Sequence, residues 1–141
     1  MNKSWRAGQV AVEALLVVVI LSLLTFGGIE LSRGVAVRQA LDSGTGAATR
    51  ALSLDPAQWS FATNLVQQSV NQNVMGTQPP VTMQVYDVSN TPRSSAWLSG
   101  SPFGTGFIVE ASVPFQMDIP FLPDSAVTIR VCHWGIVERY P

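Results

Sequence analysis

Hydrophobic residues form one long run near the start of the chain. Residues 14–29 contain no charged side chain. As an α-helix this run is about 24 Å long, which is shorter than the ~30 Å hydrocarbon core of a bilayer. Extending the helix back to Gln9 gives about 32 Å, which is enough to span the hydrocarbon core. The extension also brings Glu13 into or near the membrane, where a carboxylate is energetically unfavourable. Lys3 and Arg6 precede the run, so the positive-inside rule predicts a cytoplasmic N-terminus and an exported remainder.

Helical spacing of apolar residues continues beyond this run, to about residue 54. An amphipathic stripe is predicted from Leu31, Val35, Leu41, Ala48 and Leu52. A strip of small residues accompanies it: Gly34, Ala40, Gly44, Ala47, Ala48 and Ala51. Such a strip fits a close contact between helices, and it fits equally an alanine-rich helix resting on its own domain. The Ser-Gly-Thr-Gly sequence at 43–46 lacks the lysine and the preceding strand of a nucleotide loop and predicts a weak or kinked point in the helix.

A second helix is predicted over about 56–75. Asp55 is a good N-cap and Pro56 suits the first helical position, and Gly76 is a natural stop. One face of this helix is apolar: Trp59, Ala62, Leu65, Val66, Val70 and Val74. The other is polar: Gln67, Gln68, Asn71, Gln72 and Asn73.

From Val81 onward the apolar residues alternate, which predicts strands over about 81–88, 106–121 and 125–138. The residues predicted to share one face of each strand are Val81, Met83 and Val85, then Phe107, Val109, Ala111, Val113 and Phe115, then Val127, Ile129 and Val131. Pro114 disfavours a central position late in the second of these strands. Residues 89–105 read as a loop, with Trp97 and Phe103 as candidate anchors. Short connections favour an antiparallel sheet.

These elements predict an α+β fold: a long N-terminal transmembrane helix, then a second helix packed on a small antiparallel sheet. We expect three parts, a leader over 1–8, a transmembrane and amphipathic helix over 9–54, and an exported domain over 55–141.

Composition narrows the function. Only 12% of the 141 residues are charged, about half the share in a soluble protein, which disfavours both disorder and a freely soluble cytosolic enzyme. The net charge of −1 gives no general attraction to nucleic acid. Cys132 and His133 are the sole cysteine and histidine, so an intramolecular disulfide and a Cys/His zinc site are excluded.

Catalytic chemistry is not predicted. Cys132 and His133 are neighbours on a strand, so their side chains point to opposite faces and do not form a dyad. Asp87 and Glu110 are the acids that strand pairing might bring together, and we expect them to be solvated surface groups. We therefore expect no enzyme activity, no cofactor and no metal.

Three interpretations of the N-terminal segment remain open. A cleaved secretory signal requires a small-x-small site after the apolar run, and none of good quality follows. A plain signal anchor is the second interpretation. A prepilin-type signal, cleaved before the apolar run, is favoured by a basic leader ending in Gly8, with Gln9 next and Glu13 at the head of the apolar helix. A glycine at the cut leaves the backbone accessible to a peptidase at the membrane face.

Residues 7–52 resemble the start of TadE-like proteins, the pilin-like proteins of tight adherence (Tad, or Flp) pili. The resemblance is carried by the segments 6–14, 28–31, 37–42 and 47–51 together with the apolar run. Ala14 follows Glu13 where major Flp pilins have tyrosine, and the chain is longer than those pilins, which favours a minor pilin or pseudopilin.

The resemblance implies a function and partners. It implies cleavage between Gly8 and Gln9 by a prepilin peptidase, storage in the inner membrane, and a role in pilus assembly and surface adhesion. Glu13, which the cut would make the fifth residue, is the expected assembly residue. Expected partners are the prepilin peptidase, other pilin and pseudopilin subunits, the Tad-type assembly platform and the membrane. The alternative is a single-pass, membrane-anchored extracytoplasmic binding module outside any pilus.

Overall fold

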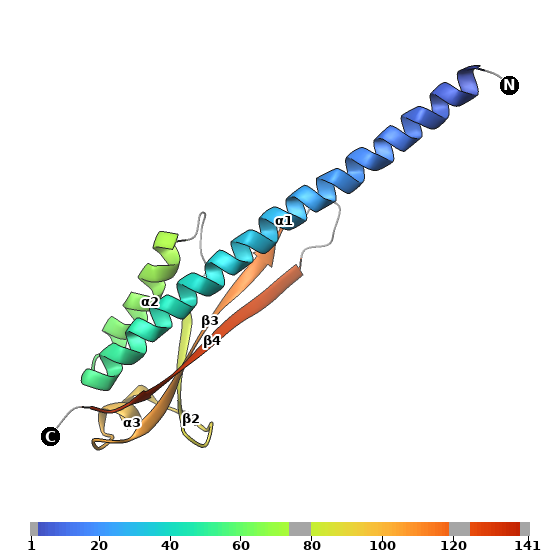
Figure 1. Cartoon of the computed structure of the whole chain (residues 1–141). Coiled ribbons are helices and arrows are strands. Elements are labelled where there is room, and N and C mark those ends of the chain that lie inside the picture. Colours follow the sequence, from blue (N-terminus) through green and yellow to red (C-terminus); the bar gives the residue numbers. More distant parts are fainter. Residues whose placement is uncertain (1–2, 74–79, 119–124, 139–141) are drawn as a thin grey trace.

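The computed structural model describes residues 3–73, 80–118 and 125–138. A very long helix leads into a small domain of two layers, one of helices and one of strands (Figure 1). The elements are α1 (Lys3–Leu54), α2 (Trp59–Asn73), β1 (Thr82–Asp87), β2 (Pro92–Arg93), α3 (Ser95–Ser99), β3 (Gly106–Met117) and β4 (Ser125–Ile136). The predicted α+β class, with a long N-terminal apolar helix, is confirmed.

Helix α1 is one element of 52 residues. It passes through residues 43–46 without a break, so no kink is seen where the sequence predicts a weak or kinked point (Figure 1). Gly44 has a different purpose, since a Cβ on it would lie 2.9 Å from the Cβ of Ser69 and 3.0 Å from the Cα of Val66. The small residue lets α1 and α2 approach closely, and the contact is made within the domain.

The core lies between the helices and one face of the sheet. Val37, Leu41 and Leu52 from α1 are almost fully buried in it, as are Val66 and Val70 from α2. The C-terminal half of α1 therefore belongs to the same packed unit as the residues after 54. Leu31 and Val35 do not continue this stripe, because they are 70% and 55% exposed.

The sheet is antiparallel, in the order β2-β1-β3-β4. All five residues predicted to share one face of β3 are buried: Phe107, Val109, Ala111, Val113 and Phe115. Pro114 is tolerated because β1 pairs with β3 only as far as Ser112. Beyond that point Pro114 has its partner, Thr128, on the β4 side alone, so this end of the central strand is an edge.

Helix α2 begins at Trp59, three residues after Pro56. Asp55 does not cap the helix; its carboxylate accepts hydrogen bonds from Ala57 N at 3.2 Å and Gln58 Nε2 at 2.9 Å. These bonds hold a turn between the helices, and the first helical bond runs from Ala62 N to the carbonyl of Gln58. Predicted residues 74 and 75 lie outside the described part of the chain.

Residues 89–105 are not entirely a loop. The hydroxyl of Ser94 accepts from Trp97 N at 3.2 Å and begins the short helix α3. Trp97 packs against the core as predicted, whereas Phe103 is 51% exposed and does not act as a buried anchor.

Candidate functional site

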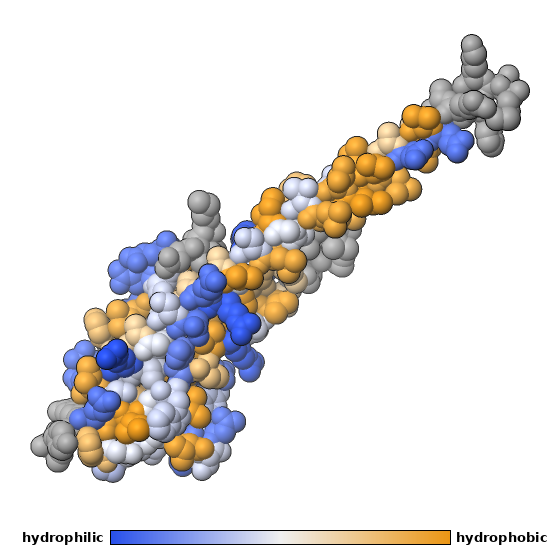
Figure 2. Space-filling model, viewed as in Figure 1, coloured by the Kyte–Doolittle hydropathy of each residue, from blue (hydrophilic) through white to orange (hydrophobic). Residues whose placement is uncertain are grey.

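The main candidate surface is the N-terminal half of α1. Large apolar side chains are exposed around this part of the helix, and on the face that Figure 2 shows they cover most of the stretch that projects from the domain. We call this stretch the apolar sleeve. Its exposed side chains are Val10, Val12, Leu15, Leu16, Val17, Val18, Val19, Ile20, Leu21, Leu24, Phe26, Ile29 and Leu31. An all-apolar helix must be covered by lipid or by protein.

This helix is long and apolar enough to cross a membrane. Its most apolar 18-residue window has a mean hydropathy of 2.5 and is not buried anywhere against the rest of the chain. It therefore suggests a membrane anchor at the N-terminal end.

The three predicted site residues lie on this projecting part of the helix. Gly8, Gln9 and Glu13 are all exposed, and a Cβ added to Gly8 would meet no atom within 4 Å. Gln9 and Glu13 are four residues apart, so they lie on one face of α1, one turn from each other. Their roles in cleavage and assembly stay predictions.

Glu30, near the other end of the sleeve, is a site that sequence reasoning missed. Its side chain is only 8% exposed, and its Oε1 accepts from Arg33 Nη1 at 2.7 Å. Its Oε2 is buried without a hydrogen-bond partner among the described residues. The guanidinium of Arg33 also lies over the ring of Phe115, 5.8 Å from its centroid. The sequence holds no sign of this burial, because it depends on where β3 meets α1.

An apolar groove of about 260 Å³ opens beside Glu30. Its walls come from α1 on one side and from the ends of β3 and β4 on the other: Glu30, Leu31, Gly34, Val35, Arg38, Phe115, Met117, Val127 and Ile129. Gly34 makes room for Phe115, whose Cε1 is 3.5 Å from the position of a Cβ. We call this the Glu30 groove.

Cys132 and His133 do not meet. His133 Nε2 lies 3.0 Å from Asp42 Oδ1 of α1, whereas Cys132 Sγ contacts Glu110 Oε2 at 3.8 Å on the opposite face. Burial, together with the charge of Glu110, raises the pKa of the Cys132 thiol. This thiol is therefore a poor nucleophile.

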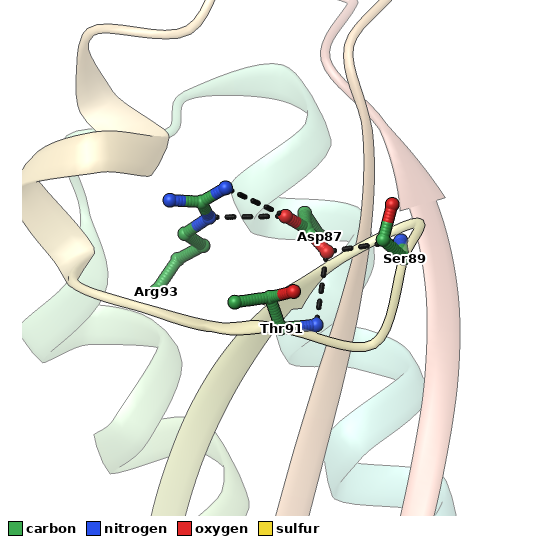
Figure 3. A network of polar contacts seen from close by, with 4 residues as sticks. All are labelled: Asp87, Ser89, Thr91 and Arg93. Carbon is green, nitrogen blue, oxygen red and sulfur yellow. Dashed lines mark hydrogen bonds and ion pairs between the residues drawn. The ribbon is translucent and has the colours of Figure 1, made fainter.

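Asp87 is the centre of a polar network at the β1–β2 turn (Figure 3). Its Oδ1 accepts from Ser89 N and Thr91 N, each at 2.9 Å, and its Oδ2 accepts from Arg93 Nη2 at 2.8 Å. The bond from Thr91, with those from Arg93 and Ser89, lowers the pKa of Asp87. The network holds the turn in which Asn90 adopts a positive φ of 60°; it leaves no carboxylate oxygen free for catalysis.

The acids of the sheet are not brought together. Asp87 is opposite Phe107 and Glu110 is opposite Gln84 in the strand register. Within the ranges that the structure describes, no group of three His, Cys, Asp or Glu side chains is arranged to hold a metal ion.

The N-terminal third of the chain is the part that matches a known family. Residues 8–50 match the family of TadE-like proteins. The match confirms the resemblance predicted for residues 7–52, and it covers both the apolar sleeve and most of the buried half of α1. No curated protein and no solved structure matches the chain. The TadE-like segment thus includes Gly8, Gln9, Glu13 and Glu30, while the sheet lies outside it.

Proposed function

We propose that this protein is a minor pilin or pseudopilin of a Tad-type pilus, and that it supports pilus assembly and surface adhesion. One observation carries the proposal: the TadE-like segment is a single helix whose first half is an exposed apolar sleeve and whose second half is built into a folded domain. A subunit with this shape can be stored in a membrane by the sleeve. It can later exchange lipid for the apolar helices of other subunits.

Processing is the first step of this function. A prepilin peptidase cuts between Gly8 and Gln9, removing the basic leader with Lys3 and Arg6 and leaving the sleeve attached to the domain. The exposure of Gly8 and the open space around it support access by a peptidase. The domain is exported, because the positive leader stays on the cytoplasmic side.

The partners follow from the same step. The chain binds first the prepilin peptidase, and then other pilin and pseudopilin subunits and the Tad-type assembly platform. We propose no enzyme activity for this protein. The separation of Cys132 from His133 and the raised pKa of the Cys132 thiol support a non-enzymatic role.

N-terminal sequencing of the full chain extracted from membranes tests the proposal. We expect the mature chain to begin at Gln9, and Gly8→Leu to block the cut because a bulky side chain replaces an open backbone. An intact Met1 would favour the alternative, a membrane-anchored binding module outside any pilus. A start beyond Ile29 would identify an ordinary secretory signal instead.

Glu13 provides the second test. After cleavage the new α-amino group of Gln9 lies one helical turn away, and in an assembly a neighbour's amine can pair with Glu13 and fix the register between subunits. Buried pairs contribute more to specificity than to stability in the best-attested cases. Glu13→Ala is therefore expected to leave cleavage and insertion intact while reducing piliation and the recovery of partner subunits. Normal piliation with normal partner recovery contradicts this role.

A further inference from the structure

The outer edge of β4 carries a long row of backbone hydrogen-bonding groups. β4 pairs with β3 on one side, and within the described ranges no strand pairs with its other side. Val137 N donates to the carbonyl of Thr105, and the carbonyl of Val137 accepts from Gly104 N, so the backbone of Val137 points toward β3. Because this direction alternates along a strand, the N–H and C=O groups of the even-numbered residues from 126 to 136 point to the open edge.

This edge lacks several features by which proteins protect an exposed strand, namely shortness, proline, lysine and β-bulges. β4 is 12 residues long, contains neither proline nor lysine, and pairs one-to-one with β3 along its whole length. The opposite edge of the sheet is different, since β2 has 2 residues and one of them is Pro92. The contrast indicates that the β4 edge is kept open for a further strand.

A cleft of about 290 Å³ lies along this edge, between β4 and α1. Residues 133–136 and Glu138 form one wall, and α1 forms the other with Gly46, Thr49, Arg50 and Ser53. Side chains of a strand added to β4 point alternately to the two faces of the sheet, so every second side chain points toward α1 and this cleft. An open edge beside a pocket for alternate side chains is an arrangement that binds extended peptides.

Three arginines lie beside the open edge. Arg130 is on β4, its side chain is 65% exposed, and the nearest carboxylate is 4.0 Å away. Arg38 and Arg50 lie on the side of α1 toward β4, since they line the Glu30 groove and the cleft, and neither forms an ion pair with another described residue. The acids on this side are Glu138 and Asp42, and Asp42 already contacts the imidazole of β4. The excess of positive charge favours an acidic occupant.

Another copy of this chain in the same membrane does not fit the edge. β4 runs in the same direction as α1 (Figure 1). Gly46 of α1 lies beside His133, and farther along both segments the carbonyl of Ser53 accepts from Glu138 N. Two copies that join their β4 edges antiparallel therefore have sleeves pointing in opposite directions. Copies anchored in one membrane have sleeves pointing the same way, so the strand that fits comes from a different protein.

We propose that the open edge of β4 binds an extended acidic segment of another protein by strand addition. The segment runs antiparallel to β4, since this pairing is the more stable per residue. Its acidic side chains lie toward Arg38 and Arg50, which are about 18 Å apart along α1, the length of about five extended residues. Its apolar side chains lie on the other face beside Trp134, which is 60% exposed. The proposal rests neither on cleavage nor on a pilus.

Isothermal titration calorimetry of the full chain in a neutral detergent tests the proposal. The probe is a peptide of about ten residues, the length of the open edge, in which valine and glutamate alternate. The control peptide has lysine in place of glutamate. We expect the glutamate peptide to bind about tenfold more tightly at low salt, and the difference to shrink as salt is added. Equal affinity of the two peptides, or no binding of the glutamate peptide, overturns the proposal.

Methylation of the peptide backbone tests strand addition itself. In an antiparallel pair, residues that exchange hydrogen bonds lie directly opposite each other and share one face of the sheet. The even-numbered residues of β4 share the face of Trp134, so the valines lie opposite them and donate their N–H groups to β4. N-methylation of the valines should abolish binding, whereas N-methylation of the glutamates should leave it intact. Binding of both methylated peptides contradicts strand addition.

Two variants locate the charge effect. The double change Arg38→Gln and Arg50→Gln should weaken binding of the glutamate peptide about fivefold, because it removes two exposed ion pairs. Arg93→Gln removes the same charge at the opposite edge of the sheet and should leave the affinity unchanged. An equal loss in both variants places the peptide elsewhere. The peptide comparisons use the wild type, so they decide the matter even if a variant fails to fold.

Discussion

The two halves of α1 are equally helical and have opposite surroundings. Between Val10 and Leu31 the large apolar side chains point in all directions, and most of them are exposed. Between Val37 and Leu52 the buried residues include the small Ala40 and Ala48, and Gly44 lies where α2 comes close. An apolar surface on all sides suits a liquid-like environment such as lipid, whereas a one-sided surface with small residues suits a fixed neighbour.

The largest expected effect on folding comes from truncating the chain at either of two places: between the two halves of α1, or after the end of α1. A fragment of residues 29–141 keeps Val37, Leu41 and Leu52 and should unfold cooperatively as a domain with mixed helix and strand. A fragment of residues 55–141 loses these buried residues and should not fold. Circular dichroism with urea titration of both fragments measures this. A cooperative transition of the shorter fragment would place the domain boundary at residues 54 and 55, as the sequence predicts.

A matched pair of leucines gives the next effect. Leu41 is fully buried and Leu24 is 68% exposed. Leu41→Ala should destabilise the domain by about 2–5 kcal/mol, because it removes buried methyl groups and leaves a cavity. Leu24→Ala should change the free energy of unfolding of the domain by less than about 0.5 kcal/mol. Equal losses in a chemical denaturation experiment would mean that the sleeve packs on the domain.

Two glycines of α1, Gly44 in the packed half and Gly28 in the exposed half, allow the same comparison. Gly44→Ala forces a Cβ to within 3.0 Å of α2 backbone and should destabilise by about 1–3 kcal/mol. At Gly28 a Cβ meets nothing within 4 Å. Gly28→Ala should therefore favour the helix by up to about 1 kcal/mol through propensity alone. The unfolding of the full chain in detergent provides both values, and a stabilising Gly44→Ala would show that the helices do not touch there.

The smallest effect is expected at Asp87, which belongs to the β1–β2 turn and not to α1. Its lowered pKa means that its contribution to stability is present above the ordinary carboxyl pKa and is lost as the pH falls through the folded-state pKa. Wild type and Asp87→Asn should thus differ slightly in melting temperature at neutral pH and converge in acid. A difference that grows in acid contradicts the network at the β1–β2 turn.

Some of this architecture could be predicted locally and some could not. The inward face of β3 follows from alternation alone, since Phe107 to Phe115 obey a period of two whatever lies next to them. The exposure of Leu31 and Val35 could not be predicted, because it depends on how far along α1 the sheet extends. The residue type of Asp55 predicts a helix cap, but the competing turn with Ala57 and Gln58 uses the same carboxylate.

Some residues of the candidate site could likewise be predicted from the sequence, and others could not. Gly8, Gln9 and Glu13 form a pattern within six residues, so the sequence alone presents them. Glu30 looks like any helical acid until β3 brings Phe115 over its neighbour Arg33. Residues that are close in space but distant in the chain leave no local signal.

The unbroken course of α1 also has a mechanical consequence. Its 52 residues form a rod about 78 Å long with no joint between the apolar sleeve and the packed domain. A pull on the domain therefore loads the sleeve directly along its axis, and a twist of the domain turns the sleeve with it. Force applied to the domain at one end of this rigid helix is therefore transmitted to whatever holds its N-terminal end.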